Sequence, residues 1–461
     1  MALLCVPPAA RGDDEKPLPR QIGSPPPPEA TGTGFSFGSY GRVGIGIDGR
    51  GHTGYGVNVI SHGSRLELPP YLELDLYYGG QIGNSDARWR VILAPAFDGD
   101  LFHFTGDFAS RFGVRNAYVE TDGLGTRGLN IWAGSRQLRG DDIYLLNYWP
   151  LDNLNTVGAG ASLYRDKLYL QIHGGLNRLN DSTQFDTVAL PARGLGPPVQ
   201  SLVTDRPRSI GSFKATYFLG PKDVQWGAKV SVYGEIHFLP TGQRVYLPQQ
   251  RTERLPADTG WVAGAQFGTW LRPFTFLNLF FRSAGGLGAL GELTPQRTVD
   301  LQRRTASTRE FLGALSLNYE TRFIGINGAA FIRRYSDAAP GNYQNGKYLE
   351  GIIIVRPHVY LSKYFQVATE YSYQKRQYGG FDPVANRRLS PQVFRASIFP
   401  IVAPFGRGTF SRPIIYGVVT YSRLTNDART SLFDPTDVRY SSNNVLYLGL
   451  GAEWWFNSSY R

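Results

Sequence analysis

The sequence has very little cysteine, and this limits the kinds of site that the chain can form. Cys5 is the only cysteine among the 461 residues, so the body of the chain can form neither an internal disulfide nor a cysteine metal site. The six histidines are scattered and show no ligand-like spacing such as His-Glu-x-x-His. We therefore expect no metal and no cofactor, and we interpret a histidine such as His237 as a polar lining residue of a strand.

Long apolar stretches are also missing. No uninterrupted apolar run approaches the roughly 20 residues that a transmembrane helix needs. Hydrophobic residues nevertheless make up 42% of the chain, which is enough for one large architecture or for two to three ordinary domains. Aromatic residues reach 13%, with 55 glycines and 27 residues each of Tyr and Phe, and this composition favours many short β-strands.

Positive charge exceeds negative charge, and the formal net charge is +11. Such a balance fits a nucleic-acid partner, an anionic surface or an interior that attracts anions. The arginines are dispersed rather than gathered in a stripe, and no helix-turn-helix, zinc-finger or single-strand-binding signature accompanies them. We therefore expect no nucleic-acid partner.

Residues 1–34 differ in composition from the rest of the chain. Ala2-Leu3-Leu4-Cys5-Val6 is similar to the end of a secretory hydrophobic region, and Pro8-Ala9-Ala10 could provide a small-residue cleavage site. The basic start of a signal peptide is lacking, so we interpret this stretch as a signal peptide that is truncated or mis-started, with a disordered tail as the alternative. Four prolines at 25–28 then predict a stiff, extended linker. We assign residues 1–34 to this leader and 35–461 to one folded body.

From Phe37 onward, apolar and polar side chains alternate with period two. Between residues 40 and 48 the apolar set is Val43, Ile45 and Ile47, and the polar set is Tyr40, Arg42 and Asp48. The same alternation recurs at 71–77, 168–173, 228–238 and 365–374. Each of these strands therefore has one apolar and one charged face. The charged face would meet bulk water in a soluble sandwich and line the lumen in a membrane barrel.

The lengths of the connections distinguish these two folds. Tight turns are indicated at 124–127, 165–167, 272–274, 320–322 and 362–364, and long polar connections near 49–67, 137–157, 178–208, 239–258, 285–307 and 424–444. Alternation of short and long connections is typical of outer-membrane barrels. We predict an all-β fold, a transmembrane antiparallel β-barrel of roughly 18 strands. The last strand is expected to end at Phe456, in the aromatic girdle.

One long connection, within 131–160, carries an unusual mixture of residues. It begins as a strand-like run, continues through charged and aromatic residues, and closes on Gly158-Ala159-Gly160. A long polar segment of this kind would normally form a solvated surface loop. We predict instead that it folds into the barrel as a constriction loop.

Six short motifs, in the same order along the chain, resemble the maltoporin family of sugar porins. They lie at 37–46, 131–136, 157–160, 355–357, 411–413 and 453–456. The resemblance spans about residues 35–456. It implies an eighteen-stranded, homotrimeric porin of the bacterial outer membrane, surrounded by its lipid, whose third loop folds inward. It also implies passive diffusion of carbohydrates and no enzymatic activity.

The resemblance further implies which residues would contact a sugar. The aromatic path would comprise Tyr40, Tyr71 and Trp455, with Trp261 added by a looser match, and the polar track would comprise Arg42, Arg65, Arg115 and Arg139. The constriction loop would present Asp141, Asp142, Asn147, Tyr148 and Trp149. The period-two alternation agrees with this assignment, because it predicts inward side chains for Tyr40, Arg42, Tyr71 and Trp455.

Asn147 stands where the family usually has an aspartate, and Tyr148 or Trp149 where it has a tyrosine. This departure leaves the choice of sugar open, including maltodextrin-like oligosaccharides. It also leaves two alternatives, a general or anion-preferring diffusion porin and a non-transporting structural or adhesin barrel whose loops plug the lumen. Asp141 and Asp142 could also be read as a glycoside-hydrolase pair. Adjacent residues on an extended segment point to opposite sides, so we do not expect catalysis.

Overall fold

The computed structural model describes residues 33–108, 110–181, 183–190, 199–220, 226–246, 251–271, 274–294, 298–339, 346–383 and 385–458. The leader predicted at 1–34 lies outside these ranges, except for its last two residues. Arg272 and Pro273, which belong to one of the predicted tight turns, also lie outside them.

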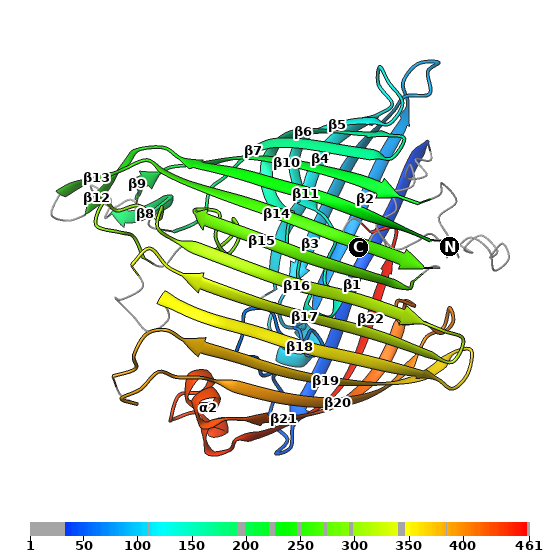
Figure 1. Ribbon diagram of the computed structural model, residues 1–461, viewed down its shortest axis with the longest axis vertical. Helices are drawn as coiled ribbons and strands as arrows, with labels where there is room; N and C mark the ends of the chain where they lie inside the picture. The colour runs from blue at the N-terminus through cyan, green and yellow to red at the C-terminus, as the bar shows by residue number, and fades with distance from the viewer. Residues whose placement is uncertain are drawn as a thin grey trace.

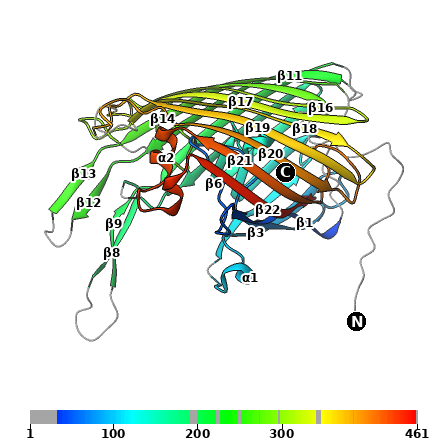
Figure 2. The ribbon, with the colours of Figure 1, turned by 90° about the horizontal axis from the view of Figure 1, so that it is seen from below.

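The described strands form one large antiparallel sheet that closes on itself (Figures 1 and 2). It has 18 strands, and β1 (Gly34–Asp48) pairs with both β2 (Tyr71–Gln81) and the last strand, β22 (Asn444–Phe456). The other strands are β3 (Arg88–Asp98), β4 (Arg111–Asp122), β5 (Leu129–Arg139), β6 (Asn153–Arg165), β7 (Leu168–Asn177), β10 (Arg208–Leu219), β11 (Trp226–Leu239), β14 (Asp258–Leu271), β15 (Phe276–Gly286), β16 (Arg309–Glu320), β17 (Ile324–Ser336), β18 (Lys347–Tyr360), β19 (Phe365–Tyr378), β20 (Gln392–Val402) and β21 (Ile414–Leu424). The predicted fold class is confirmed.

Long and short connections alternate around the barrel, as predicted. Long connections follow β1, β3, β5, β7, β11, β15, β17, β19 and β21. Two of them contain hairpins that reach beyond the barrel wall: β8 (Phe185–Leu190) with β9 (Val199–Asp205), and β12 (Gly242–Tyr246) with β13 (Arg251–Leu255) (Figure 1). Short helices occupy others: α1 (Phe102–Thr105), η2 (Tyr144–Leu146), α2 (Asn426–Leu432) and η4 (Val438–Ser441). Because short turns mark the periplasmic end of such barrels, the long connections belong to the outer end.

The two faces of the barrel wall differ as the alternation predicted. In β11 the side chains of Val230, Val232 and Ile236 are exposed on the outside, whereas Lys229 and His237 are buried on the inside. Exposed apolar side chains recur on the outside of the other strands, and lipid is the solvent that suits such a surface. Among the described residues, no helix combines the length and apolarity that crossing a bilayer requires.

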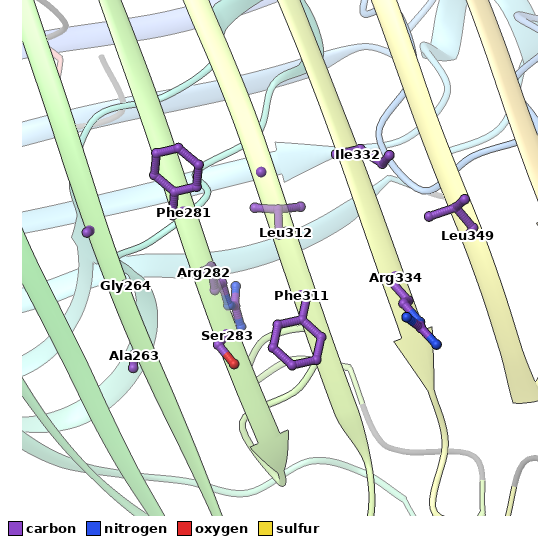
Figure 3. A pocket seen from close by; sticks show the side chains of 12 residues that line it. Ala263, Gly264, Phe281, Arg282, Ser283, Phe311, Leu312, Ile332, Arg334 and Leu349 are labelled. Atoms are coloured by element: carbon purple, nitrogen blue, oxygen red, sulfur yellow. The ribbon is translucent and has the colours of Figure 1, made fainter.

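A hollow of about 620 Å³ lies on the outer wall over strands β14 to β18 (Figure 3). Its lining includes the small residues Ala263 and Gly313 and the outward side chains of Phe281, Phe311 and Ile332. Because these side chains point away from the lumen, the hollow faces the lipid and does not belong to a path through the barrel.

The lumen is largely filled on one side. Two long connections fold inward, a first loop (residues 49–70) and the predicted constriction loop, here called the inward loop (residues 140–152). Their apolar side chains pack against inward residues of the wall. The cluster includes Val57, Val59 and Ile60 of the first loop, Ile143, Tyr144 and Leu145 of the inward loop, and Phe280, Leu312, Phe331 and Ile352 of the wall.

Candidate solute-binding site

A cavity of about 380 Å³ remains between the inward loop, the loop at 287–308 and the wall formed by β1 to β6. Its lining residues are Arg42, His62, Tyr71, Asp98, Arg115, Arg139, Asn147, Tyr148, Trp149, Leu151, Asn153, Glu235, Arg282 and residues 290–294. Seven residues that the sequence predicted are among them: Arg42, Tyr71, Arg115, Arg139, Asn147, Tyr148 and Trp149. Aromatic and guanidinium groups therefore share one cavity.

The inward loop is held to the far wall by buried ion pairs. Asp141 accepts hydrogen bonds from the Lys229 ammonium and, at 2.6 Å, from Gln266 Nε2. Asp152, near the end of the loop, pairs with Lys214 at 2.6 Å. Burial alone would raise the pKa of Asp141, but the ammonium groups of Lys229 and Lys214 lower it overall. Asp141 therefore anchors the loop rather than lining the cavity.

Asp142, the other acid predicted for the constriction, is also buried and does not line the cavity. The tip of the loop instead presents Asn147, which follows the short helix η2 in a left-handed conformation with φ of 49°. Asparagine adopts this conformation more readily than other non-glycine residues. This conformation accounts for an amide side chain at the tip.

Tyr148, next to the tip, is fixed from two directions. His62 of the first loop stacks on its ring with centroids 3.8 Å apart, and Arg333 donates a hydrogen bond of 3.1 Å to its hydroxyl. Burial, together with Arg333 and Arg282, lowers the pKa of His62 well below its usual value, so the imidazole is neutral at pH 7. The first loop and the inward loop therefore support each other.

We expect the backbone conformation of Asn147 to limit what can replace it. Asn147→Val should lower the free energy of unfolding by about 1–2 kcal/mol, because a β-branched residue is disfavoured in the left-handed region. Asn147→Gly should be nearly neutral, since glycine adopts that conformation without strain. Urea unfolding of the refolded protein, followed by tryptophan fluorescence, measures both variants. Equal midpoints for the valine and glycine variants would contradict this expectation.

Three of the four residues predicted for the aromatic path, Tyr40, Tyr71 and Trp455, lie together in space. Tyr40 and Trp149 are buried in one cluster, with Tyr71 and Trp455 packed against it. Tyr40 is opposite Trp455 across the barrel closure, and its ring centroid is 5.9 Å from that of Tyr71. Only Tyr71 and Trp149 line the cavity, while Tyr40 is fully buried behind them. Tyr40 and Trp455 therefore pack against the aromatic residues of the cavity without lining it.

Trp261 was wrongly predicted to extend this path. It lies on β14 directly opposite Ile236 of β11, and both side chains are exposed on the outer face of the wall. The inward positions of the same stretch are taken by Val262 and Gln266, which are buried. Trp261 therefore faces the lipid and not the lumen.

Arg115 reaches the cavity because of an irregularity in the wall. The register between β3 and β4 shifts at Ala94 and Pro95, so that Asn116 and Val114 are paired and Arg115 is not. Proline cannot donate a ladder hydrogen bond, and a bulge of this kind re-aims the extra side chain. Without the bulge, the Arg115 side chain would point outward, as the side chain of Ala117 does. The Arg115 guanidinium instead donates to Gln137 Oε1 and lines the cavity.

Arg42 and Arg139 complete the basic side of the cavity. Arg42 Nε donates to the carbonyl of Pro69 at 2.9 Å, and its guanidinium lies 5.3 Å from the Tyr71 ring centroid. The Arg139 guanidinium lies 3.8 Å from the Trp149 ring centroid. Each of these arginines therefore accompanies an aromatic ring that lines the same cavity.

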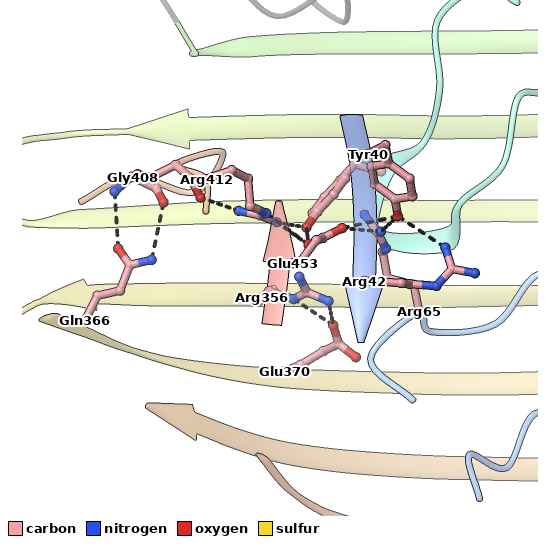
Figure 4. A network of polar contacts seen from close by, with 11 residues as sticks. Tyr40, Arg42, Arg65, Arg356, Gln366, Glu370, Gly408, Arg412 and Glu453 are labelled. Atoms are coloured by element: carbon pink, nitrogen blue, oxygen red, sulfur yellow. Dashed lines mark hydrogen bonds and ion pairs between the residues drawn. The ribbon is translucent and has the colours of Figure 1, made fainter. Parts of the chain in front are cut away.

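Arg65, the remaining predicted donor, is instead part of a buried polar network centred on Glu453 (Figure 4). Its guanidinium donates to Glu453 Oε1 at 2.5 Å and to the Tyr40 hydroxyl at 2.7 Å. On the other side Arg412 donates to Glu453 Oε2 at 2.7 Å, and the Tyr144 hydroxyl donates to the same oxygen at 3.1 Å. One carboxylate therefore joins the first loop, the inward loop and the connection that carries Arg412.

That connection, residues 403–413, is a further inward segment that the sequence did not predict, and we call it the inward turn. Gly408 exchanges hydrogen bonds of 3.2 and 3.3 Å with the Gln366 side chain, and Thr409 donates to Glu320 at 2.9 Å. Phe410 packs into the apolar cluster beside Tyr144. The turn therefore lies inside the barrel at its short-turn end. The sequence signal for this network was limited to the motifs at 411–413 and 453–456, which contain Arg412 and Glu453.

A closed β-barrel with an apolar outer wall, a polar inner wall and a loop folded into its lumen defines an outer-membrane porin. The sequence comparisons agree with this class. A model of the LamB porin family matches residues 35–456, so the chain belongs to the LamB porin family. No curated protein matches the chain.

The chain is also similar to several solved structures, each at low sequence identity. OccD3 (OpdP) of Pseudomonas aeruginosa is 11% identical, covers 96% of this chain and 95% of its own, and has a TM-score of 0.45. OccAB4 of Acinetobacter baumannii is 8% identical, with 92% and 97% covered and a TM-score of 0.43. Wzi of Escherichia coli, described as a carbohydrate-binding β-barrel, is 10% identical, with 90% and 83% covered and a TM-score of 0.39.

Proposed function

We propose that the protein is a passive, homotrimeric channel for facilitated diffusion of carbohydrates across the outer membrane, exported by a signal peptide within residues 1–34. The observation that carries this proposal is the pairing of aromatic and basic groups in one cavity. Tyr71 and Trp149 line it together with Arg42, Arg115 and Arg139. Membership of the LamB porin family supports it.

The chemistry of a sugar ring fits this lining. The C–H-rich face of a ring stacks on an aromatic side chain, and for nucleobases such stacking is worth about 1–3 kcal/mol per ring. Guanidinium groups donate hydrogen bonds to the hydroxyls and replace water. Contacts of this strength hold a solute and still let it leave, as conduction requires.

The runner-up function is an anion-preferring diffusion porin. It is favoured by the net charge of +11 and by the arginines of the cavity. A plugged, non-transporting barrel is the third reading, favoured by the inward loops and the inward turn.

Single-channel conductance in a planar bilayer tests these readings. We expect glucose, sucrose or maltooligosaccharides to block the current in a concentration-dependent way. Tyr71→Ala should weaken the block about fivefold, corresponding to the loss of about 1 kcal/mol of stacking. Trp261→Ala is the matched control, because it removes an aromatic ring from the outer face, and it should leave the block unchanged. Current that no sugar blocks would favour the anion porin, and absence of any current would favour the plugged barrel.

A further inference from the structure

We propose that the cavity selects saccharides that carry a carboxylate, such as uronic acids, over neutral sugars. This inference rests on the proposed carbohydrate function and specifies its substrate class. The observations that carry it are the charges around the cavity and the partners that those charges already have.

Two arginines of the cavity make their hydrogen bonds to neutral groups. Arg42 donates to the Pro69 carbonyl at 2.9 Å and to the Tyr40 hydroxyl at 3.2 Å. Arg115 donates to the amide oxygen of Gln137, and the nearest carboxylate oxygen, that of Glu73, is 4.0 Å from its Nε. That Glu73 oxygen already accepts a hydrogen bond from Tyr71 at 2.5 Å. Both guanidinium groups therefore retain capacity for an anionic partner.

The acids that line the cavity, in contrast, are already engaged by other groups. Asp98 pairs with Arg111 at 2.5 Å. Glu235 accepts from Tyr233 at 2.6 Å and lies 2.7 Å from His237 Nε2.

Glu292, the third acid of the cavity, is engaged by Asn155. Its Oε1 accepts from the backbone amide of Asn155 at 3.0 Å and from the side-chain amide at 2.7 Å. Burial raises the pKa of Glu292, which favours its neutral form. The three acids of the cavity lining therefore have partners other than Arg42 and Arg115.

The inward loop adds no acidic residue to the cavity lining. The tip there is Asn147, whose side chain is an uncharged amide. Asp141 of the same loop is paired with Lys229 and lies outside the cavity lining. A solute carboxylate would therefore meet no like charge from the tip of the loop.

A uronic acid combines the two features that this cavity recognises. A guanidinium fork binds a carboxylate through two parallel hydrogen bonds, which are stronger than those to a neutral hydroxyl. The sugar ring that carries the carboxylate can stack on Tyr71 or Trp149, which line the same cavity. A simple anion would use only the first feature and a neutral sugar only the second.

Glucose and glucuronate form a matched pair of probes, since they differ only at C6. The measurement uses planar bilayers at low salt, where charges are least screened. We expect glucuronate to block the current at a concentration at least about tenfold lower than glucose does. The reason is that a charge-assisted hydrogen bond is stronger than a hydrogen bond between neutral groups. Arg115→Gln and Arg42→Gln should each reduce this preference, and Arg115→Lys should retain part of it. Arg334→Gln, which removes an exposed charge from β17, should leave it unchanged.

Asn147→Asp provides a second test that preserves the loop, because aspartate also tolerates the left-handed conformation. The added charge should weaken the block by glucuronate more than it changes the block by glucose. Equal block by glucose and glucuronate would overturn the inference and leave the carbohydrate function standing. Acetate as effective as glucuronate would also overturn it, in favour of simple anion binding. Block by no sugar at all would overturn both the inference and the proposed function.

Discussion

Trp149→Ala should abolish most of the interaction between the channel and a sugar. Trp149 lines the cavity, and the Arg139 guanidinium lies 3.8 Å from its ring centroid. Removing the ring eliminates a stacking surface worth up to about 3 kcal/mol and also a cation–π contact that fixes Arg139. We expect the sugar concentration for half-maximal block to rise by up to about 150-fold.

The control for this variant is Trp149→Phe, which retains an aromatic face. Because Trp149 is buried, its truncation also costs stability, so folding must be verified by the gel mobility of the unheated barrel. A folded Trp149→Ala channel that sugars block as well as the parent would show that the aromatic surface does not contact the solute. A threefold or smaller change in the phenylalanine variant is the expected contrast, since most of the stacking area remains.

The strand pattern could be predicted because the two solvents of a barrel wall differ so strongly. Apolar residues such as Ile45 and Ile47 face outward, and Asp48 follows the inward parity. Because of this difference, the sequence predicts the two-residue period of the strands, their approximate number and the inward positions of Tyr40 and Trp455. The folding of residues 140–152 into the lumen is confirmed by the cluster in which Tyr144 and Tyr148 are buried.

The alternation of apolar and polar residues did not predict side-chain direction where the lumen itself is apolar. Along β14 the inward Val262 packs against the inserted loops, so both faces of the strand carry apolar residues and alternation cannot orient Trp261. Arg115 shows the opposite problem, since its inward direction depends on the bulge beside Pro95. One extra residue in a strand reverses the direction, inward or outward, of the side chains that follow it.

The inward turn could not be predicted for a different reason. It connects β20 to β21 at the end of the barrel where connections are short. The 11 residues 403–413 carry no pattern that predicts which side chains across the lumen they contact. Arg412 lies two residues before Ile414, which pairs with Glu453, so their contact depends on the register of β21 against β22. Gly408 and Thr409 bond to Gln366 of β19 and Glu320 of β16, and no local pattern in the turn indicates these partners.

Glu453→Gln should release the inserted segments from the wall. The carboxylate holds Arg65 of the first loop at 2.5 Å and Arg412 of the inward turn at 2.7 Å, and all three side chains are at most 8% exposed. Removing one partner of a buried ion pair costs about 3–5 kcal/mol, because the remaining charge stays buried without compensation. Two guanidinium groups depend on this one carboxylate. We therefore expect the first loop and the inward turn to detach while the barrel itself remains closed by its β1–β22 ladder.

The measurement is the unitary conductance of the variant, which should rise as the lumen empties, together with proteolysis of the inward turn from the short-turn end. Asp437→Asn is a matched control, because it removes the acid of the Asp437–Arg439 ion pair. This pair lies at a partly exposed position of the loop after β21, and exposed ion pairs contribute about 0–1 kcal/mol to stability. It should change neither conductance nor proteolysis. If Glu453→Gln conducts like the parent and its turn resists protease, then the apolar packing of Phe410 and Tyr144, rather than the buried carboxylate, holds the lumen closed on that side.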